Sequence, residues 1–186
     1  MPMPVEFSKT EIEDVLEVKT GLFEDDRGFF TETYSQPVWQ AGGFDGVFVQ
    51  DNLSRSAKGT LRGMHYQLST HGMGKLVRVV KGSVFDVAVD LRKGSPSFGK
   101  WVGRTLSDDN ALSLWIPEGF AHGFVALEED TLVWYKCTGT HAPEAERALN
   151  YRDPEVAIEW PIEPTIISGK DAEAPMFADI EADFVY

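Results

Sequence analysis

The chain lacks several features that define common protein classes. Only Cys137 of its 186 residues is a cysteine, so no disulfide can form within the chain. No apolar run approaches the ~20 residues that a membrane-spanning helix needs. The acidic start MPMPVEFSKTEIEDV has no basic region followed by an apolar one, as a secretory signal would. Together these absences predict a cytoplasmic protein that does not contact membranes.

Helical periodicity is weak, and internal repeats and low-complexity segments are missing. A chain of 186 residues that is 42% hydrophobic can bury one sizeable core, so we expect a single domain over residues 1–186. Its 17 glycines and 10 prolines separate short apolar runs, and this spacing of turn residues is typical of an all-β barrel or sandwich. Only residues 35–41 and 174–182 could form short helices.

Three segments have the composition of strands: Lys75–Lys81, Ser83–Arg92 and Thr131–Thr138. A turn at Gly82 would connect the first two. Within Ser83–Arg92 the odd-numbered apolar residues fall on one face, and Asp86 falls on the other.

Basic residues are scarce, 17 against 30 acidic ones, which gives a net charge of -13. A chain of this charge should repel nucleic acid. Residues 50–110 reverse the balance, with ten basic and five acidic residues. Either these are solvated surface side chains, or they form a local site for a small phosphorylated ligand.

Two histidine-containing clusters could carry chemistry. In GTLRGMHYQ (59–67), Arg62 and His65 would not share a face of a regular strand, but Gly63 permits a bulge that re-aims one of them. In WIPEGFAHGF (115–124), a tight turn precedes His122, which resembles the second signature of the cupin superfamily. Metal cupins place a second histidine where this chain has Gln67, so we expect no catalytic metal.

Without a metal, the histidines are either structural, each bonded to a backbone carbonyl, or act in proton transfer. A histidine with a carboxylate partner is an oriented general base, and a lysine can hold the charge that develops on an enolate oxygen. A tyrosine on the other side of the substrate can return the proton. The segment IISGKD (166–171) would supply the carboxylate, and WYK (134–136) the tyrosine.

Longer segments carry a family resemblance: FEDDRGFFTETY (23–34), VQDNLSRSAKGTLRGMHYQ (49–67), GKLVRVVKGSVFDVAVDLRKGSPSFGKW (74–101), LWIPEGFAHGF (114–124), WYKCT (134–138) and DPEVAIEWP (153–161). With these segments, the chain from about Gly21 to Phe177 resembles the dTDP-4-dehydrorhamnose 3,5-epimerases. The resemblance implies a cupin double-stranded β-helix (jelly-roll) with a few short helices. It also implies a homodimer that exchanges N-terminal strands.

The implied reaction inverts C3 and C5 of dTDP-4-dehydro-6-deoxy-D-glucose to give dTDP-4-dehydro-L-rhamnose, without a cofactor. By resemblance, His65 is the proton acceptor, oriented by Asp171. Tyr135 is the proton donor, and Lys75 stabilises the enolate oxygen. The residues implied in substrate binding are Phe23, Arg27, Phe30, Glu32, Gln50, Asp51, Asn52, Arg62, His122, His141, Glu146 and Lys170.

His141 departs from the family pattern, because it stands where the family usually has a tyrosine that stacks on thymine. An imidazole stacks with less area than a phenol ring. Either the base preference differs or the substitution is tolerated.

Four alternatives remain open from the sequence. The chain could be an epimerase that inverts only C3 or only C5, or a ketoisomerase that moves the carbonyl between C3 and C4. It could also be a non-catalytic nucleotide-sugar-binding protein or a metal-dependent cupin oxygenase.

Overall fold

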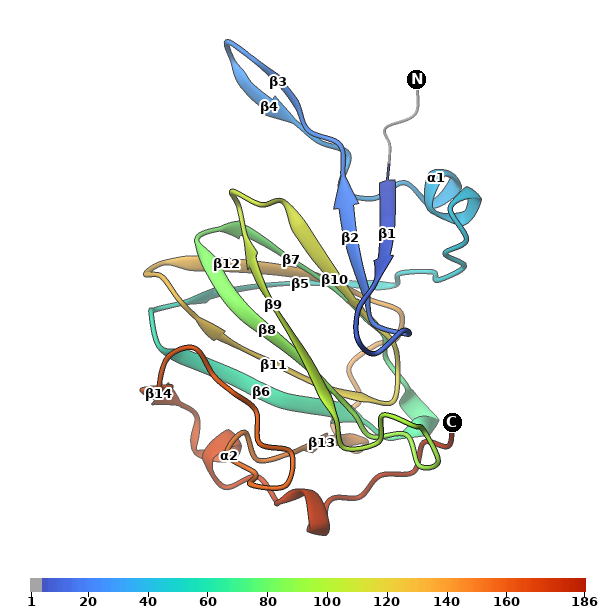
Figure 1. The fold of residues 1–186 in the computed structure, drawn as a ribbon, viewed down its shortest axis with the longest axis vertical. Helices are drawn as coiled ribbons and strands as arrows, with labels where there is room; N and C mark the ends of the chain where they lie inside the picture. The colour runs from blue at the N-terminus through green and yellow to red at the C-terminus, as the bar shows by residue number, and fades with distance from the viewer. Residues whose placement is uncertain (1–4) are drawn as a thin grey trace.

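Two β-sheets face each other and make up most of the molecule, as the computed structural model of residues 5–186 shows (Figure 1). The first sheet has the order β1 (Val5–Lys9), β2 (Leu16–Thr20), β10 (Leu112–Ile116), β7 (Lys75–Lys81), β12 (Thr131–Cys137) and β5 (Gln50–Ser56). The second has the order β13 (Glu146–Ala148), β6 (Thr60–Gln67), β11 (Phe120–Ala126), β8 (Ser83–Asp90) and β9 (Trp101–Ser107), with β14 (Ile166–Ile167) parallel to β6. The expected all-β jelly-roll is confirmed.

The strands expected from the sequence are present with small changes at their ends. The strand Lys75–Lys81 is β7, while β8 ends at Asp90 and β12 ends at Cys137. Gly82 joins β7 to β8 with a φ of +77°, a conformation that glycine adopts at no steric cost.

One of the two expected helices is correct. Helix α1 (Gln36–Ala41) carries a proline in its first turn, where the missing N–H is not needed. The helix expected over residues 174–182 is wrong. Pro175 disfavours helical backbone at the residue before it, and only a three-ten turn, Phe177–Asp179, follows. Helix α2 lies earlier, at Gly169–Ala172, and a second three-ten turn spans Ser69–His71.

Both faces of β8 are buried. Val84 and Ala88 belong to the core between the two sheets. Val87 and Val89, on the other face, pack against the C-terminal part of the chain, including Tyr151. A carboxylate on the inner face of this strand therefore lies inside the sandwich and not at its surface.

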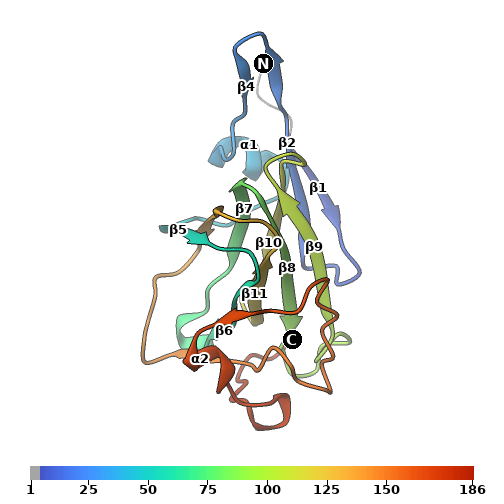
Figure 2. The same cartoon turned by 90° about the vertical axis from the view of Figure 1, so that its left-hand side faces the viewer.

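The C-terminal part of the chain covers the open face of the second sheet, and α2 lies beside β6 (Figure 2). Within residues 5–186, no helix has both the length and the apolarity to cross a membrane.

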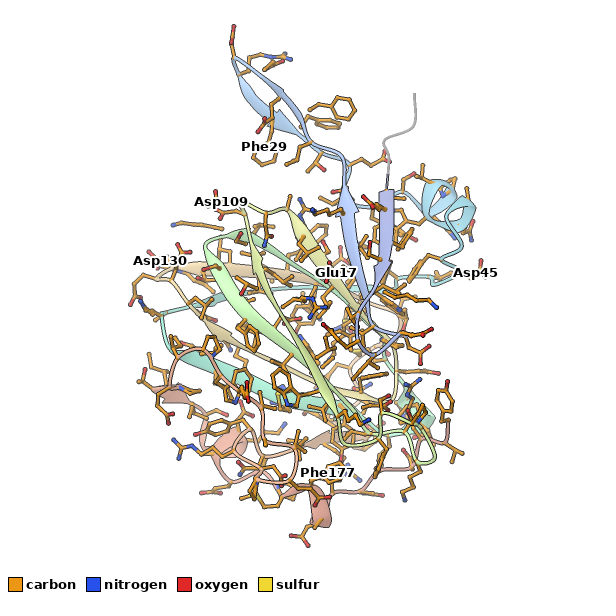
Figure 3. All side chains as sticks on the ribbon, viewed as in Figure 1. Glu17, Phe29, Asp45, Asp109, Asp130 and Phe177 are labelled. Carbon is orange, nitrogen blue, oxygen red and sulfur yellow. The ribbon has the colours of Figure 1, made fainter. Side chains whose placement is uncertain are left out.

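A hairpin of β3 (Phe23–Asp25) and β4 (Gly28–Phe30) projects from the body of the molecule (Figure 1). Its three phenylalanines leave 56 to 68% of their surface exposed. Figure 3 shows Phe29 on this hairpin, apart from the packed sheets. The hairpin thus presents apolar rings that the body of this chain does not cover.

Candidate active site

A cavity of about 550 Å³ opens between the two sheets, and the four residues expected to be catalytic all line it: His65, Lys75, Tyr135 and Asp171. A second cavity of about 330 Å³ shares the first three of these residues. The two cavities therefore form adjoining parts of one cleft, with the expected catalytic groups where they meet.

The expected bulge at Gly63 is present and brings Arg62 and His65 to the same cavity. His65 pairs with His122 and Arg62 pairs with Phe124, so two residues of β6 oppose one residue of β11. Gly63 has a φ of +139°, and a Cβ there would lie 2.4 Å from the Cα of Gly123. Only glycine fits this close approach, and the bulge is what gives the arginine and the histidine a common direction.

His65 Nε2 lies 2.7 Å from Asp171 Oδ1, which comes from α2. The Ser168 hydroxyl caps this helix by accepting a hydrogen bond from the Asp171 amide, which fixes the carboxylate beside β6. Burial of Asp171 alone would raise its pKa, but its contacts with His65 outweigh burial and hold that pKa below its usual range. The carboxylate is thus an anion that can orient the imidazole and stabilise it when it gains a proton.

Lys75 and Tyr135 belong to the first sheet and face His65 from the opposite wall. Burial lowers the pKa of Lys75, whose ammonium donates to the His65 carbonyl at 3.4 Å. Burial raises the pKa of Tyr135, so the phenol keeps its proton at neutral pH. The cavity therefore has a base on one wall and a protonated phenol on the other.

His122 forms a second pair, with Asp86, that the sequence did not predict. Its Nε2 lies 2.8 Å from Asp86 Oδ1, and the carboxylate is fully buried. Burial lowers the pKa of His122 despite the neighbouring carboxylate. The available signal was an acidic residue that alternates with the apolar Val84 and Ala88 along the strand.

The remaining polar groups form the rim of the cleft. Glu146 Oε2 lies 2.8 Å from Lys170 Nζ and 3.4 Å from His141 Nε2. Gln50 donates to Asn52 at 3.1 Å and accepts from the His141 amide at 3.1 Å. All five residues line one cavity or the other, so the structure brings these expected binding residues together.

Some of the expected binding residues line neither cavity. Asp51 lies on the opposite face of β5 from Gln50 and Asn52, and it pairs with Lys136 at 2.7 Å. Arg27 pairs with Asp25 at the tip of the hairpin. The residues outside both cavities are Phe23, Arg27, Phe30, Glu32 and Asp51.

Among residues 5–186, no group of three or more His, Cys, Asp and Glu side chains is arranged to hold a metal ion. Gln67 stands where a metal cupin has its second histidine, and it instead connects two loops by hydrogen bonds. Its amide nitrogen donates to the His71 carbonyl and its oxygen accepts from the Ala142 amide, both at 2.7 Å.

Comparisons with known proteins identify the family to which the chain is similar. The family model described as dTDP-4-dehydrorhamnose 3,5-epimerase matches residues 9–179. The enzyme of that name from Pseudomonas aeruginosa is 51% identical, over 94% of this chain and 97% of its own. A dTDP-6-deoxy-D-glucose-3,5-epimerase from Legionella pneumophila, solved with dTDP-4-keto-L-rhamnose, is 45% identical, with a TM-score of 0.92 over 96% of this chain and 95% of its own.

A more distant solved structure is a 3'-monoepimerase from Streptomyces bikiniensis with dTDP-quinovose. It is 33% identical, with a TM-score of 0.85 over 91% of this chain and 87% of its own. The family model and the close relatives both cover nearly the whole chain. The chain belongs to the dTDP-4-dehydrorhamnose 3,5-epimerase family.

Proposed function

We propose that the protein inverts C3 and C5 of dTDP-4-dehydro-6-deoxy-D-glucose to give dTDP-4-dehydro-L-rhamnose. One observation carries the proposal. A carboxylate-bound histidine and a protonated tyrosine face each other across a single cavity, which a lysine beside the tyrosine also lines. An inversion needs this arrangement, because the proton leaves one face of a carbon and returns to the other.

The chemistry follows from the C4 ketone. Protons on C3 and C5 are acidic because each carbon adjoins the carbonyl. His65 removes the proton, Asp171 stabilises the resulting imidazolium, and Lys75 holds the negative charge on the enolate oxygen. Tyr135 then protonates the carbon from the opposite face. One base and one donor serve both carbons if the sugar reorients between the two steps and, in the same interval, His65 releases its proton to solvent and Tyr135 regains one.

Arg62 is suited to bind the diphosphate. Its guanidinium donates to the Ser56 hydroxyl at 3.0 Å and to the Arg55 carbonyl at 3.1 Å, both neutral groups. It forms no ion pair with any of the described residues, so its charge remains available for a phosphate. Lys170 lines the same cavity, and the smaller cavity that adjoins it has room for the nucleoside.

The protein is further proposed to act as a homodimer that exchanges N-terminal strands. Arg27 and the exposed rings of Phe23 and Phe30 lie on the projecting hairpin, away from the cavities of their own chain. In a dimer, these side chains would lie over the cavity of the second copy and help to close it.

We place the protein in the cytoplasm because its single cysteine suits a reducing compartment.

The main alternative is inversion at one carbon only, because a 3'-monoepimerase shares the fold. Incubation with dTDP-4-dehydro-6-deoxy-D-glucose, followed by proton NMR, separates the two activities. Ring coupling constants of a sugar inverted at both C3 and C5 would support the proposal. A product inverted at one carbon would establish the alternative, and unchanged substrate would overturn the enzyme assignment for this sugar.

A further inference from the structure

Asp86 occupies an unusual position for a carboxylate. It lies on the inner face of β8 between Val84 and Ala88, two residues of the apolar core, and none of its surface is exposed. A buried carboxylate is costly unless it is paired and hydrogen-bonded. Oδ1 is bonded to His122, but Oδ2 has no hydrogen-bond partner among residues 5–186. Core packing alone does not explain a carboxylate at this position.

The pairing sets the tautomer of His122. When Asp86 is ionised it can only accept hydrogen bonds, and the 2.8 Å contact then places the imidazole proton on Nε2. Burial disfavours a second proton on the ring and is the largest effect, so the pKa of His122 is lowered although Asp86 favours the charged form. The imidazole is therefore neutral, and its Nδ1 carries a lone pair.

This lone pair is available to a ligand. His122 lines the larger cavity, and no group within residues 5–186 donates a hydrogen bond to its Nδ1. Lys75 lines the same cavity and can only donate. The inner end of the cavity thus offers one acceptor and one donor, which together fit a hydroxyl group next to a carbonyl or enolate oxygen.

We propose that Asp86 is a positioning residue, which fixes His122 as the neutral Nε2–H tautomer and so makes its Nδ1 the acceptor for a hydroxyl group of the sugar. The ligand assignment rests on the proposed function, whereas the tautomer does not. Lys75 holds the oxygen on which charge develops, and His122 holds the neighbouring hydroxyl. Without Asp86 the imidazole could carry its proton on either nitrogen, and the tautomer protonated at Nδ1 could not accept that hydroxyl proton.

The tautomer can be measured without substrate. In protein labelled with 15N-histidine, two-dimensional 1H–15N spectra show which ring nitrogen carries the proton, and four histidines keep the assignment simple. We expect His122 to be neutral with its proton on Nε2 at pH 7.5. A protonated Nδ1, or an imidazolium, would overturn the proposal even if the enzyme is active.

Asp86→Asn tests the functional consequence. This variant should populate the Nδ1–H tautomer and reduce kcat/KM by about 10- to 100-fold, the usual effect of losing a residue that orients a ligand-binding histidine. Its affinity for dTDP, which lacks the hexose, should stay within about twofold of wild type. Asp90→Asn, which removes a buried carboxylate four residues along β8 that accepts hydrogen bonds from Arg92 and the Ser95 hydroxyl, should leave the His122 tautomer unchanged.

Two results would contradict the proposal. One is an Asp86→Asn variant with wild-type kcat/KM, and the other is one whose affinity for dTDP falls as much as its kcat/KM. If the variant does not fold, the wild-type spectrum alone decides the tautomer.

Discussion

His65 Nε2 and Asp171 Oδ1 lie 2.7 Å apart although 106 residues separate them in the chain. The proposed base comes from β6 and its carboxylate partner from α2, which Ser168 caps. The C-terminal part of the chain thus supplies part of the candidate site as well as a cover for the second sheet. Proton abstraction should therefore depend on residues at both ends of this contact.

Asp171→Asn should reduce kcat by about 10²- to 10⁴-fold, because the imidazole loses both its orienting acceptor and the charge that stabilises its protonated form. The same substitution at the exposed Asp179 should leave kcat unchanged. Steady-state assays of both variants check this. Equal kcat values for the two would show that the carboxylate does not assist the base.

The same carboxylate should contribute to acid stability. The pKa of Asp171 is held below its usual range by His65, although burial opposes this, so its contribution is complete above the unfolded pKa of ~3.9. That contribution is lost as the pH falls through the lower pKa of the folded state. Urea unfolding of wild type and Asp171→Asn should therefore converge as the pH falls below ~4. Curves that diverge there would show that the folded-state pKa is raised instead.

Tyr135→Phe should separate proton removal from inversion. The base remains, so hydrogen on the substrate still exchanges with solvent. The donor on the opposite wall is gone, so formation of the inverted product should fall by about 10²-fold or more. Proton NMR in D2O measures both rates in one sample. If both rates fall together, Tyr135 is needed for abstraction and is not the donor.

Lys75→Met should abolish turnover and stabilise the fold. Burial lowers the pKa of Lys75, so at pH 7 its charge favours the unfolded state. The pKa of Lys75 is lower in the folded state than in the unfolded state. Between the folded-state pKa and the unfolded value of ~10.4, the unfolded chain holds more of the proton, so the stability of wild type should rise with pH over this range. We expect the variant to melt about 2–4 °C higher at pH 7, a shift of about 1 kcal/mol for this size. The difference should shrink toward pH 10, and a lower Tm at pH 7 would show that Lys75 stabilises the fold.

A mixing experiment tests strand exchange. Arg27→Ala and His65→Ala each damage a site, and co-expression should give heterodimers that have one intact site if Arg27 acts on the partner's cavity. Random pairing makes about half of the dimers mixed, which predicts about one quarter of wild-type activity at low substrate concentration. Activity no higher than the average of the two single variants would place Arg27 in its own chain's site.

Several features of the site could be predicted because they depend on local chemistry. Gly63 indicated the bulge that turns Arg62 and His65 to one side. Ser168, with Asp171 three residues later, has the spacing of a helix N-cap. The start of α2 could therefore have been predicted, although a helix was expected only farther along the chain. The helix expected over residues 174–182 failed because Pro175 interrupts it and the Phe177 amide donates to Asp153 instead.

What could not be predicted depends on how distant strands align. The pairing of His122 with Asp86 follows from the register of β11 on β8, in which His122 lies opposite Ala88, a near neighbour of the aspartate. No local pattern fixes that register.

The direction of Asp51, in contrast, could have been predicted. Side chains alternate between the two faces of β5, and Gln50 and Asn52 were both expected in the site, so Asp51 must point away from it.

The proposed reaction depends most on a single base, His65, that acts at two carbons. The direct measurement is incubation of the enzyme with dTDP-4-dehydro-6-deoxy-D-glucose in D2O, followed by NMR of the sugar ring. We predict deuterium at both C3 and C5 with wild type, and at neither carbon with His65→Ala. Deuterium at one carbon only with wild type, or at both carbons with His65→Ala, would contradict the account.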